Sequence, residues 1–383
     1  MKSSRAPARH LGMLGVVVAL VVTLTTSAAA AGITRCVKPG GADGCDASIQ
    51  SAVDAAASLG ATVSSALIDV HPGVYAEAVD VPAGAVLTIR GVGPASSQIV
   101  DGSTTAAVAV FLAAHGDTRI RRTRLTLVDL TITGGSRGIE VGQRADLLVQ
   151  RCLVHDNAGN GVAVLSRATI VDSDVFANGR GAQVGWHAAA TLRGTSVRDN
   201  GGIDVYGGGI DVHGGRVTLE NCTVSGNQGV VGAGIRANLV NGNFPTFPRI
   251  DIRYSTIASN TATWSGGGIQ ATGDARRIRL QGALIADNVA PSEPDCATSF
   301  YPPLLDRGSS LVETPGSCLA VPSTRSFYGV DPMLGPLADN GGPGWTHLPA
   351  PGSPARGVAI RACPRNDQRG VLRARPCTIG AVE

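Results

Sequence analysis

The stretch GGIDVYGGGIDVHGG, residues 201–215, holds the side chains best suited to acid–base chemistry. Asp211 and His213 are two residues apart, so they would project from the same face of a β-strand. Glycoside hydrolysis needs two carboxylates about 5–9 Å apart, and Asp204 and Asp211 would supply them. A lyase instead needs a base at an acidic C–H and a donor for the sugar carboxylate, roles open to His213 and Arg236. Asp204, Asp211 and His213 are therefore the candidate catalytic residues.

Metal and nucleotide sites find little support in the pattern. The calcium-binding repeat G-G-x-G-x-D is not matched, because Asp204 comes two places early and the doublet occurs only once. A single carboxylate-lined calcium site of another kind stays open, and calcium remains a candidate cofactor if the protein is a lyase. No zinc-type Cys/His spacing, P-loop or dinucleotide fingerprint occurs, so no other cofactor is expected.

One asparagine recurs along the chain at intervals of 21 to 33 residues, which indicates an internal repeat. The residues three, eight and ten places before it keep one size class and alternate with other positions, as expected of short strands with one buried face. About three such strands fit each unit, so the units should stack as a parallel solenoid with about 4.8 Å per coil. The repeated side chains would form a ladder of amides between coils. The ladder consists of Asn157, Asn178, Asn200, Asn227, Asn260 and Asn288.

The segments before and after the repeats are expected to differ from the coils. Residues 32–64 are predicted to form an N-terminal cap, in which CDASIQSAVDAAA becomes a short helix capped by Asp46. Residues 65–290 would hold the coils. Beyond them the asparagine register is lost and proline becomes frequent, so residues 291–383 should form a coil-rich C-terminal cap. The buried face of the helix would hold Ile49, Val53, Ala56 and Ala57.

Residues 1–31 have the form of a secretory signal peptide. A basic start precedes an apolar run over residues 11–24, which is shorter than the about 20 residues of a membrane span and is followed by small residues. An uncleaved anchor is the alternative. The formal charge of +3 falls to zero once this segment and its three basic residues are removed, and no basic stretch with interleaved aromatics follows. We therefore expect a secreted monomer with no stable membrane insertion and no nucleic-acid partner.

The eight cysteines of an exported chain suggest disulfides. Cys152 and Cys222 occupy the same inward column three coils apart, about 14 Å, whereas a disulfide needs Cα atoms within about 7 Å. We expect both to be buried free thiols in a column of small residues. The other six fall into local pairs in the two caps: Cys36–Cys45, Cys296–Cys318 and Cys363–Cys377.

Two parts of the sequence resemble known families. The repeat form LENCTVSGNQG…GI and the segment IDVHPGVYAEAV resemble right-handed parallel β-helix proteins with the pectin-lyase-like fold. The tail from DPMLGPLADNGG to CTIGAVE is similar to the closing domain of exported bacterial β-helix proteins called choice-of-anchor Q, although no sorting segment follows it. Together they predict an all-β fold, a right-handed parallel β-helix solenoid with an N-terminal helix cap and a coil-rich C-terminal cap.

The resemblance also indicates where a ligand would bind. In β-helix polysaccharide enzymes the substrate lies across the outer face of the strand after the variable turn, here the strand of the form Gly-Ile-x-Val that follows each asparagine. The third residue of this strand forms an outward column of Glu140, Ala163, Gln183, Asp211, Arg236 and Gln270. The expected substrate-binding residues are Glu140, Gln183, Trp186, His187, Tyr206, Arg236 and Asn238.

Two functions fit these features. The first is an extracellular glycan-binding or surface structural module that presents this face to a polysaccharide or cell-surface glycan. The alternative is a carbohydrate-active polysaccharide lyase or glycoside hydrolase whose cleft lies around Asp204, Asp211 and His213. The fuller sequence signatures of β-helix lyases, polygalacturonases and pectin methylesterases do not occur, so the sequence leaves both functions open.

Overall fold

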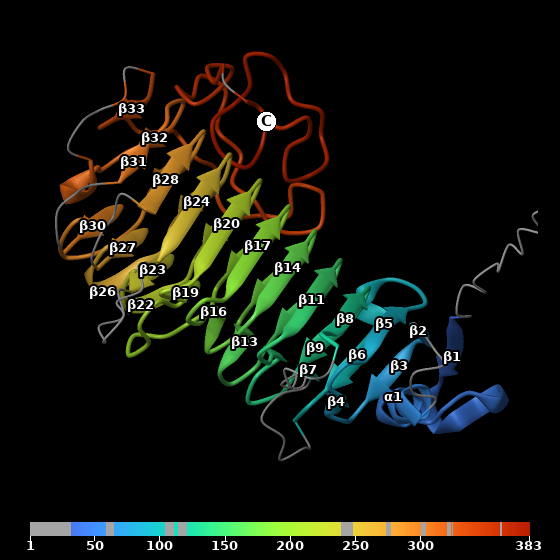
Figure 1. The fold of residues 1–383 in the computed structure, drawn as a ribbon. Helices are drawn as coiled ribbons and strands as arrows, with labels where there is room; N and C mark the ends of the chain where they lie inside the picture. Colours follow the sequence, from blue (N-terminus) through green and yellow to red (C-terminus); the bar gives the residue numbers. More distant parts are fainter. Residues whose placement is uncertain are drawn as a thin grey trace, which may run out of the picture.

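A computed structural model shows a solenoid whose coils repeat along one axis (Figure 1). The described residues are 32–58, 65–103, 111–113, 121–238, 248–272, 277–299, 304–319, 323, 325–360 and 362–383. The predicted signal peptide, residues 1–31, lies outside them. Within the described ranges, no helix has the length and apolar character that a membrane crossing requires.

Three long parallel sheets form the sides of the coils, and each strand pairs with its counterpart one coil away. Sheet A contains β1 (Ile33–Val37), β2 (Ala66–Val70), β5 (Val86–Gly91), β8 (Thr123–Val128), β11 (Ala145–Gln150), β14 (Arg167–Val171), β17 (Ala189–Arg193), β20 (Arg216–Glu220), β24 (Arg249–Arg253), β28 (Ile278–Gln281) and β31 (Leu305–Asp306). Sheet B contains β3 (Gly73–Tyr75), β6 (Gln98–Asp101), β9 (Thr131–Thr133), β12 (Leu153–His155), β15 (Asp174–Phe176), β18 (Ser196–Arg198), β21 (Thr223–Ser225), β25 (Thr256–Ala258), β29 (Leu284–Ala286), β32 (Leu311–Val312) and β33 (Phe327–Tyr328). Sheet C contains β4 (Val79–Val81), β7 (Phe111–Ala113), β10 (Ile139–Val141), β13 (Asn160–Val164), β16 (Arg180–Val184), β19 (Ile210–His213), β23 (Ile235–Asn238), β27 (Ile269–Ala271) and β30 (Cys296–Thr298).

The inward residues of the three sheets pack into one continuous apolar core. A two-stranded ledge, β22 (Gln228–Val231) and β26 (Thr261–Ser265), is inserted between sheets B and C in chain order. The predicted all-β parallel solenoid is therefore confirmed.

The repeated asparagines lie at the turn from sheet B to sheet C and bond one another, as predicted. Each side-chain nitrogen donates to the side-chain oxygen of the next asparagine at 2.9–3.0 Å, and that oxygen also accepts from a backbone N–H. The ladder ends on Asp295, whose Oδ1 accepts from the Asn288 amide at 2.8 Å. Burial raises the pKa of the Asp295 carboxyl group. The side-chain oxygens of the ladder thus accept hydrogen bonds from buried backbone N–H groups in the turn between two strands.

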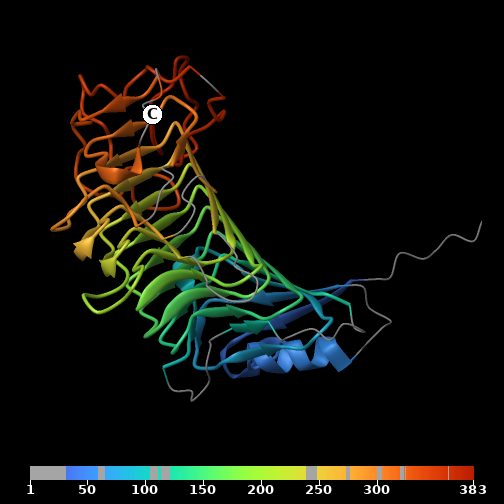
Figure 2. The same cartoon turned by 60° about the vertical axis from the view of Figure 1, so that its left-hand side comes forward.

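The N-terminal helix α1 (Ile49–Ser58) packs on β1, β2 and β4 at the first coil (Figure 2). The predicted cap by Asp46 is wrong, because the Asp46 carboxylate forms two 2.7 Å bonds with Arg35. The Glu77 carboxylate instead accepts from the first helical N–H groups at 2.7 and 2.9 Å. Ile49, Val53 and Ala56 are buried as predicted, whereas Ala57 is only half-buried and Ala52 completes the buried face.

The coils continue past residue 290, their predicted end. β30, β31, β32 and β33 extend the three sheets in parallel register. The repeated asparagine ends before the coils do. Asp295 takes the place of an asparagine in the ladder and accepts the hydrogen bond from Asn288.

The described residues of the C-terminal segment after β33 form isolated β-bridges instead of strands, and they lie against the later coils (Figures 1 and 2). His347 Nε2 lies 2.8 Å from Ser225 Oγ of sheet B. The Arg198 guanidinium of the same sheet stacks on Trp345, 4.3 Å from the ring centroid. This segment therefore covers the outer face of sheet B from β18 to β29, and its residues Ala362 and Pro364 also lie beside Arg253 at the edge of sheet A.

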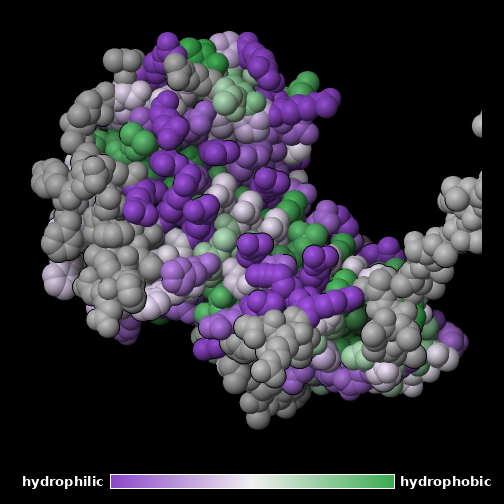
Figure 3. Space-filling view, viewed as in Figure 1, coloured by the Kyte–Doolittle hydropathy of each residue, from purple (hydrophilic) through white to green (hydrophobic). Residues whose placement is uncertain are grey.

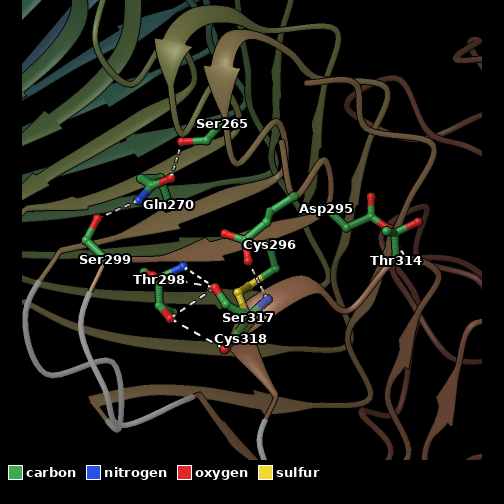
Figure 4. Close-up of a disulfide and its surroundings, with 10 residues drawn as sticks. Ser265, Gln270, Asp295, Cys296, Thr298, Ser299, Thr314, Ser317 and Cys318 are labelled. Atoms are coloured by element: carbon green, nitrogen blue, oxygen red, sulfur yellow. Dashed lines mark hydrogen bonds between the residues drawn. A yellow bond between two sulfur atoms is a disulfide. The ribbon is translucent and has the colours of Figure 1, made fainter. Parts of the chain in front are cut away.

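Three disulfides form as predicted: Cys36–Cys45, Cys296–Cys318 and Cys363–Cys377. Cys296 lies on β30, so the second disulfide ties the last strand of sheet C to the short 3₁₀ helix η5 (Gly316–Cys318), which follows β32 (Figure 4). Cys152 and Cys222 are buried and free, and burial raises the pKa of each thiol to about 12. Both thiols therefore stay protonated and unreactive inside the core.

Candidate functional site

Backbone register stacks the predicted outward column of sheet C on successive coils. The stacked residues are Glu140, Ala163, Gln183, Asp211, Arg236 and Gln270. The predicted exposure is wrong for Glu140, Ala163, Asp211 and Gln270, which are buried. Neighbouring polar side chains cover two of them: Arg137 pairs with Glu140 at 2.5 Å, and Ser265 bonds Gln270 at 2.9 Å.

Asp211 lies at the centre of a charged cluster on this face. Its side chain is 1% exposed, and His213 Nε2 lies 2.8 Å from its Oδ2. Arg180 Nε lies 3.7 Å from Oδ2, and Arg236 Nη1 lies 3.6 Å from Oδ1. Two guanidinium groups therefore flank one buried carboxylate. Asp211 is placed to orient His213.

The turn before β19, residues 201–208, covers this cluster, and we call it the covering turn. Gly207 has φ +68°, and a Cβ there would come 2.9 Å from the Cβ atoms of Asp211 and Arg236, so glycine is required by both backbone and space. Arg180 donates to the carbonyl oxygens of Tyr206 and Gly207 at 3.1–3.3 Å. The Arg236 guanidinium packs on the Tyr206 ring, 4.9 Å from its centroid. The first half of the doubled sequence is thus the covering turn, and it packs over β19, which the second half forms.

The expected pairing of Asp204 with Asp211 is not what the structure shows. Asp204 is exposed in the covering turn and has no hydrogen bond or ion pair to any residue that the structure describes. Asp211 lies beneath the same turn with its carboxylate out of solvent. The two carboxylates therefore do not form an accessible acid–base pair.

A pocket of about 340 Å³ opens on sheet C beside this cluster. Its polar wall includes Gln183 and His213, and its apolar wall includes Leu165 and Trp186. Trp186 is 50% exposed and Leu165 41% exposed. The pocket is lined by Gln143, Ala163, Val164, Leu165, Gln183, Gly185, Trp186 and His213. An exposed indole that lines one pocket with amide and imidazole groups suits a ligand with both apolar and hydrogen-bonding parts.

Of the predicted substrate-binding residues, Gln183 and Trp186 line the pocket. His187 is exposed next to Trp186 in the turn after β16. Asn238 stacks in register with His213 and accepts from Thr272 Oγ1 at 3.0 Å. Glu140, Arg236, Tyr206, His187 and Asn238 lie outside the lining of the pocket.

Sequence reasoning missed Arg180 and Asn160, which support the pocket floor. Arg180 Nη1 donates to Asn160 Oδ1 at 3.1 Å, and Asn160 Nδ2 donates to Gln183 Oε1 at 3.0 Å. Both residues directly precede the glycine that opens the repeated strand, so the Gly-Ile-x-Val frame left them out. Their equal position in successive repeats was the available signal.

Calcium was the one metal that the sequence left open. In the ranges given above, no three His, Cys, Asp or Glu side chains come together in a way that could hold a metal ion. The site is therefore considered through its protein groups alone.

Comparison with known proteins agrees with the fold. A family model described as the right handed beta helix region matches residues 116–290. The chain forms a right-handed parallel β-helix, as predicted from the resemblance. No curated relative matches the sequence.

Several solved structures follow a similar chain path. Pectate lyase Pel9A is 14% identical, with a TM-score of 0.48 over 92% of this chain and 96% of that one. The mannuronan C-5 epimerase AlgE6 A-module of Azotobacter vinelandii is 17% identical, with a TM-score of 0.46 over 73% and 92%. Carrot pectin methylesterase is 16% identical, with a TM-score of 0.41 over 70% and 88%. At these identities no residue role is transferred to this chain.

Proposed function

We propose that the protein is an extracellular glycan-binding protein whose site is the Trp186–His213 pocket on sheet C. The single observation that carries this proposal is the half-exposed indole of Trp186 in a pocket that Gln183 and His213 also line. The C–H face of a sugar ring packs well on an indole, and amide and imidazole groups can bond its hydroxyls.

Extracellular placement is proposed on two grounds. Three disulfides are typical of proteins that fold in oxidising compartments. Residues 1–31 have the form of a cleavable signal. We also propose that the C-terminal segment is the choice-of-anchor Q-type closing domain that its sequence resembles, with a structural role on sheet B.

Calorimetric titration of the mature protein with a panel of acidic and neutral oligosaccharides tests the proposal. We expect at least one sugar to bind, and Trp186→Ala to weaken it roughly tenfold, since the aromatic contact is lost. Trp264→Ala is the matched control, because this tryptophan is 70% exposed on β26, outside the pocket. Absence of sugar binding, or equal losses in both variants, would contradict the proposal.

One observation favours a second candidate function, a polysaccharide lyase. The buried Asp211 carboxylate lies 2.8 Å from His213 Nε2, and His213 lines the pocket. A carboxylate at one ring nitrogen holds the imidazole with its other nitrogen free to accept a proton. In this candidate His213 is the base and Asp211 its positioning residue.

The lyase candidate is tested by incubating each bound polysaccharide with wild-type protein and His213→Gln. A lyase would generate new unsaturated chain ends, and His213→Gln would abolish them while still binding the sugar. A polymer that binds and stays intact would be consistent with the binding function and would contradict the lyase function.

A further inference from the structure

Sheet A presents a second polar face on another side of the coil. Register between β5 and β20 aligns one central outward rank: Thr88, Thr126, Leu148, Thr169, Thr191 and Thr218. The threonines are half-buried, so their hydroxyls line the surface at the strand spacing of about 4.8 Å, interrupted at Leu148. The face is a flat row of hydrogen-bonding groups.

Arginines form the ranks on both sides of the threonines. One rank includes Arg124, Arg167, Arg216 and Arg249, and the other includes Arg90, Arg193 and Arg253. With Arg279, the strands from β2 to β28 carry eight arginines against four acidic residues, Asp69, Asp146, Glu220 and Asp251. Figure 3, which has the same view as Figure 1, shows hydrophilic side chains gathered over this sheet. The face is therefore basic, although the mature chain is neutral overall.

Half of this positive charge has no matching carboxylate on these strands, and Asp146 and Glu220 stand between arginines in the two ranks. Ion pairs join Arg90 to Asp69 at 2.8 Å and Arg249 to Asp251 at 3.1 Å. The exposed arginines with no ion pair to any residue placed in the structure are Arg124, Arg167, Arg193, Arg216 and Arg253. Arg124, Arg167 and Arg216 recur on every second coil, about 10 Å apart.

A small pocket closes the C-terminal end of this face. It has a volume of about 80 Å³, and Arg253, Arg279 and Arg307 line it with Asp251 and Gln281. Asp251 lies 3.6 Å from Arg279 Nη1, which leaves more positive than negative charge in the pocket. Arg279 Nε is buried and donates to no group within the described residues. At about 30 Å³ per water molecule, the volume suits one carboxylate or sulfate group rather than a sugar ring.

We propose that the outward face of sheet A binds an acidic polysaccharide that lies along the coil axis. One of its anionic groups occupies the Arg253–Arg279–Arg307 pocket, where guanidinium forks match the geometry of a carboxylate. The remaining anionic groups meet the arginine ranks, and the sugar hydroxyls meet the threonine rank.

The chemistry of the face distinguishes this ligand from a nucleic acid. Single-stranded nucleic acids bind where bases can stack on aromatic side chains. The strands of sheet A carry no Phe, Trp or Tyr. Hydroxyl rows between guanidinium rows suit a polymer that carries both hydroxyl and anionic groups.

Binding of polygalacturonate to protein with the substitution Trp186→Ala tests this proposal, because the sheet C pocket then contributes little. Dextran is the neutral probe and a single-stranded oligonucleotide is the competing polyanion. We expect polygalacturonate to bind, dextran not to bind, and the triple variant Arg253→Gln/Arg279→Gln/Arg307→Gln to weaken binding at least tenfold. Arg375→Gln, an exposed arginine of the C-terminal segment, should bind within about twofold of the parent.

A second triple variant keeps the proposal testable if the first variant does not fold. Arg124→Gln/Arg167→Gln/Arg216→Gln removes exposed, unpaired groups, so it should keep its circular dichroism spectrum and still lose affinity severalfold. Unchanged affinity in both folded triple variants would overturn the proposal, as would equal affinity for the oligonucleotide. Because the parent lacks Trp186, either result leaves the glycan-binding function of sheet C to its own test.

Discussion

The outward faces of sheets A and C use the same repeat in opposite ways. On sheet C the charged residues Arg180, Asp211 and Arg236 compensate one another under a covering turn. On sheet A the arginine ranks stay exposed, and few of them have a carboxylate partner. Both faces stack outward residues in register from coil to coil, and on sheet C the covering turn is inserted before β19.

This difference separates two kinds of recognition. The covering turn reduces free charge on sheet C and leaves a half-apolar pocket beside Trp186. On sheet A the exposed arginines of the two ranks form a basic surface, which we propose to follow a long polymer. Under the two proposals, one chain would hold a sugar ring on one side and a polyanion on another.

The largest expected effect tests whether the charged residues of sheet C stabilise the fold by compensating one another. Asp211→Asn should lower the free energy of unfolding by about 3 kcal/mol, because two mostly buried arginines lose their shared carboxylate. Asp69→Asn is the matched change on sheet A, where Arg90 is 46% exposed, and should cost at most about 1 kcal/mol. Urea denaturation of both variants measures the two costs. Equal costs would show that the two faces do not differ in burial of charge.

The salt dependence of ligand binding gives a second comparison of sheets A and C. Raising the ionic strength from about 0.1 M to about 1 M shortens the Debye length from about 10 Å to about 3 Å. Binding of polygalacturonate to sheet A should then weaken roughly tenfold or more, whereas a neutral sugar at the Trp186 pocket should change by less than about twofold. Titrations at the two salt concentrations measure both responses. A salt-independent affinity for polygalacturonate would remove the electrostatic contrast.

The smallest effect concerns sheet B, the face that is already covered. Burial lowers the pKa of His347 below its ordinary value of 6.5, so the folded state disfavours the charged form. As the pH falls below about 6.5, the unfolded chain binds a proton that the folded chain does not, and stability declines by at most about 1.4 kcal/mol per pH unit. His347→Gln should remove this component between pH 7 and the lowered pKa, measured by urea denaturation at several pH values. The exposed His187→Gln serves as the control, and an identical pH slope in His347→Gln and wild type would contradict the assignment.

The coil architecture could be predicted because it depends on local repetition. Each coil needs the same inward residues and the same asparagine, so columns such as Asn227 and Asn260 are visible in the sequence. The end of the solenoid was misplaced because Asp295 performs the ladder function without the asparagine. The Asp46 cap was misassigned because Glu77, distant in sequence, bonds the helix start instead.

The site could be predicted only in part. Register correctly stacked Gln183 and Asp211, since strand pairing follows the repeat. Burial of Asp211 depends on how the covering turn folds over it, and spacing does not reveal that path. The basic face of sheet A was hidden for a related reason: its arginines are far apart in sequence and become neighbours only when the coils stack.

Tryptophan emission during an oligosaccharide titration tests the central claim most directly, that Trp186 forms the sugar-binding wall of sheet C. The chain has three tryptophans, and we predict that a saturable emission change accompanies binding in wild-type protein and is lost in Trp186→Phe. The same emission change with the same affinity in Trp186→Phe would contradict the account.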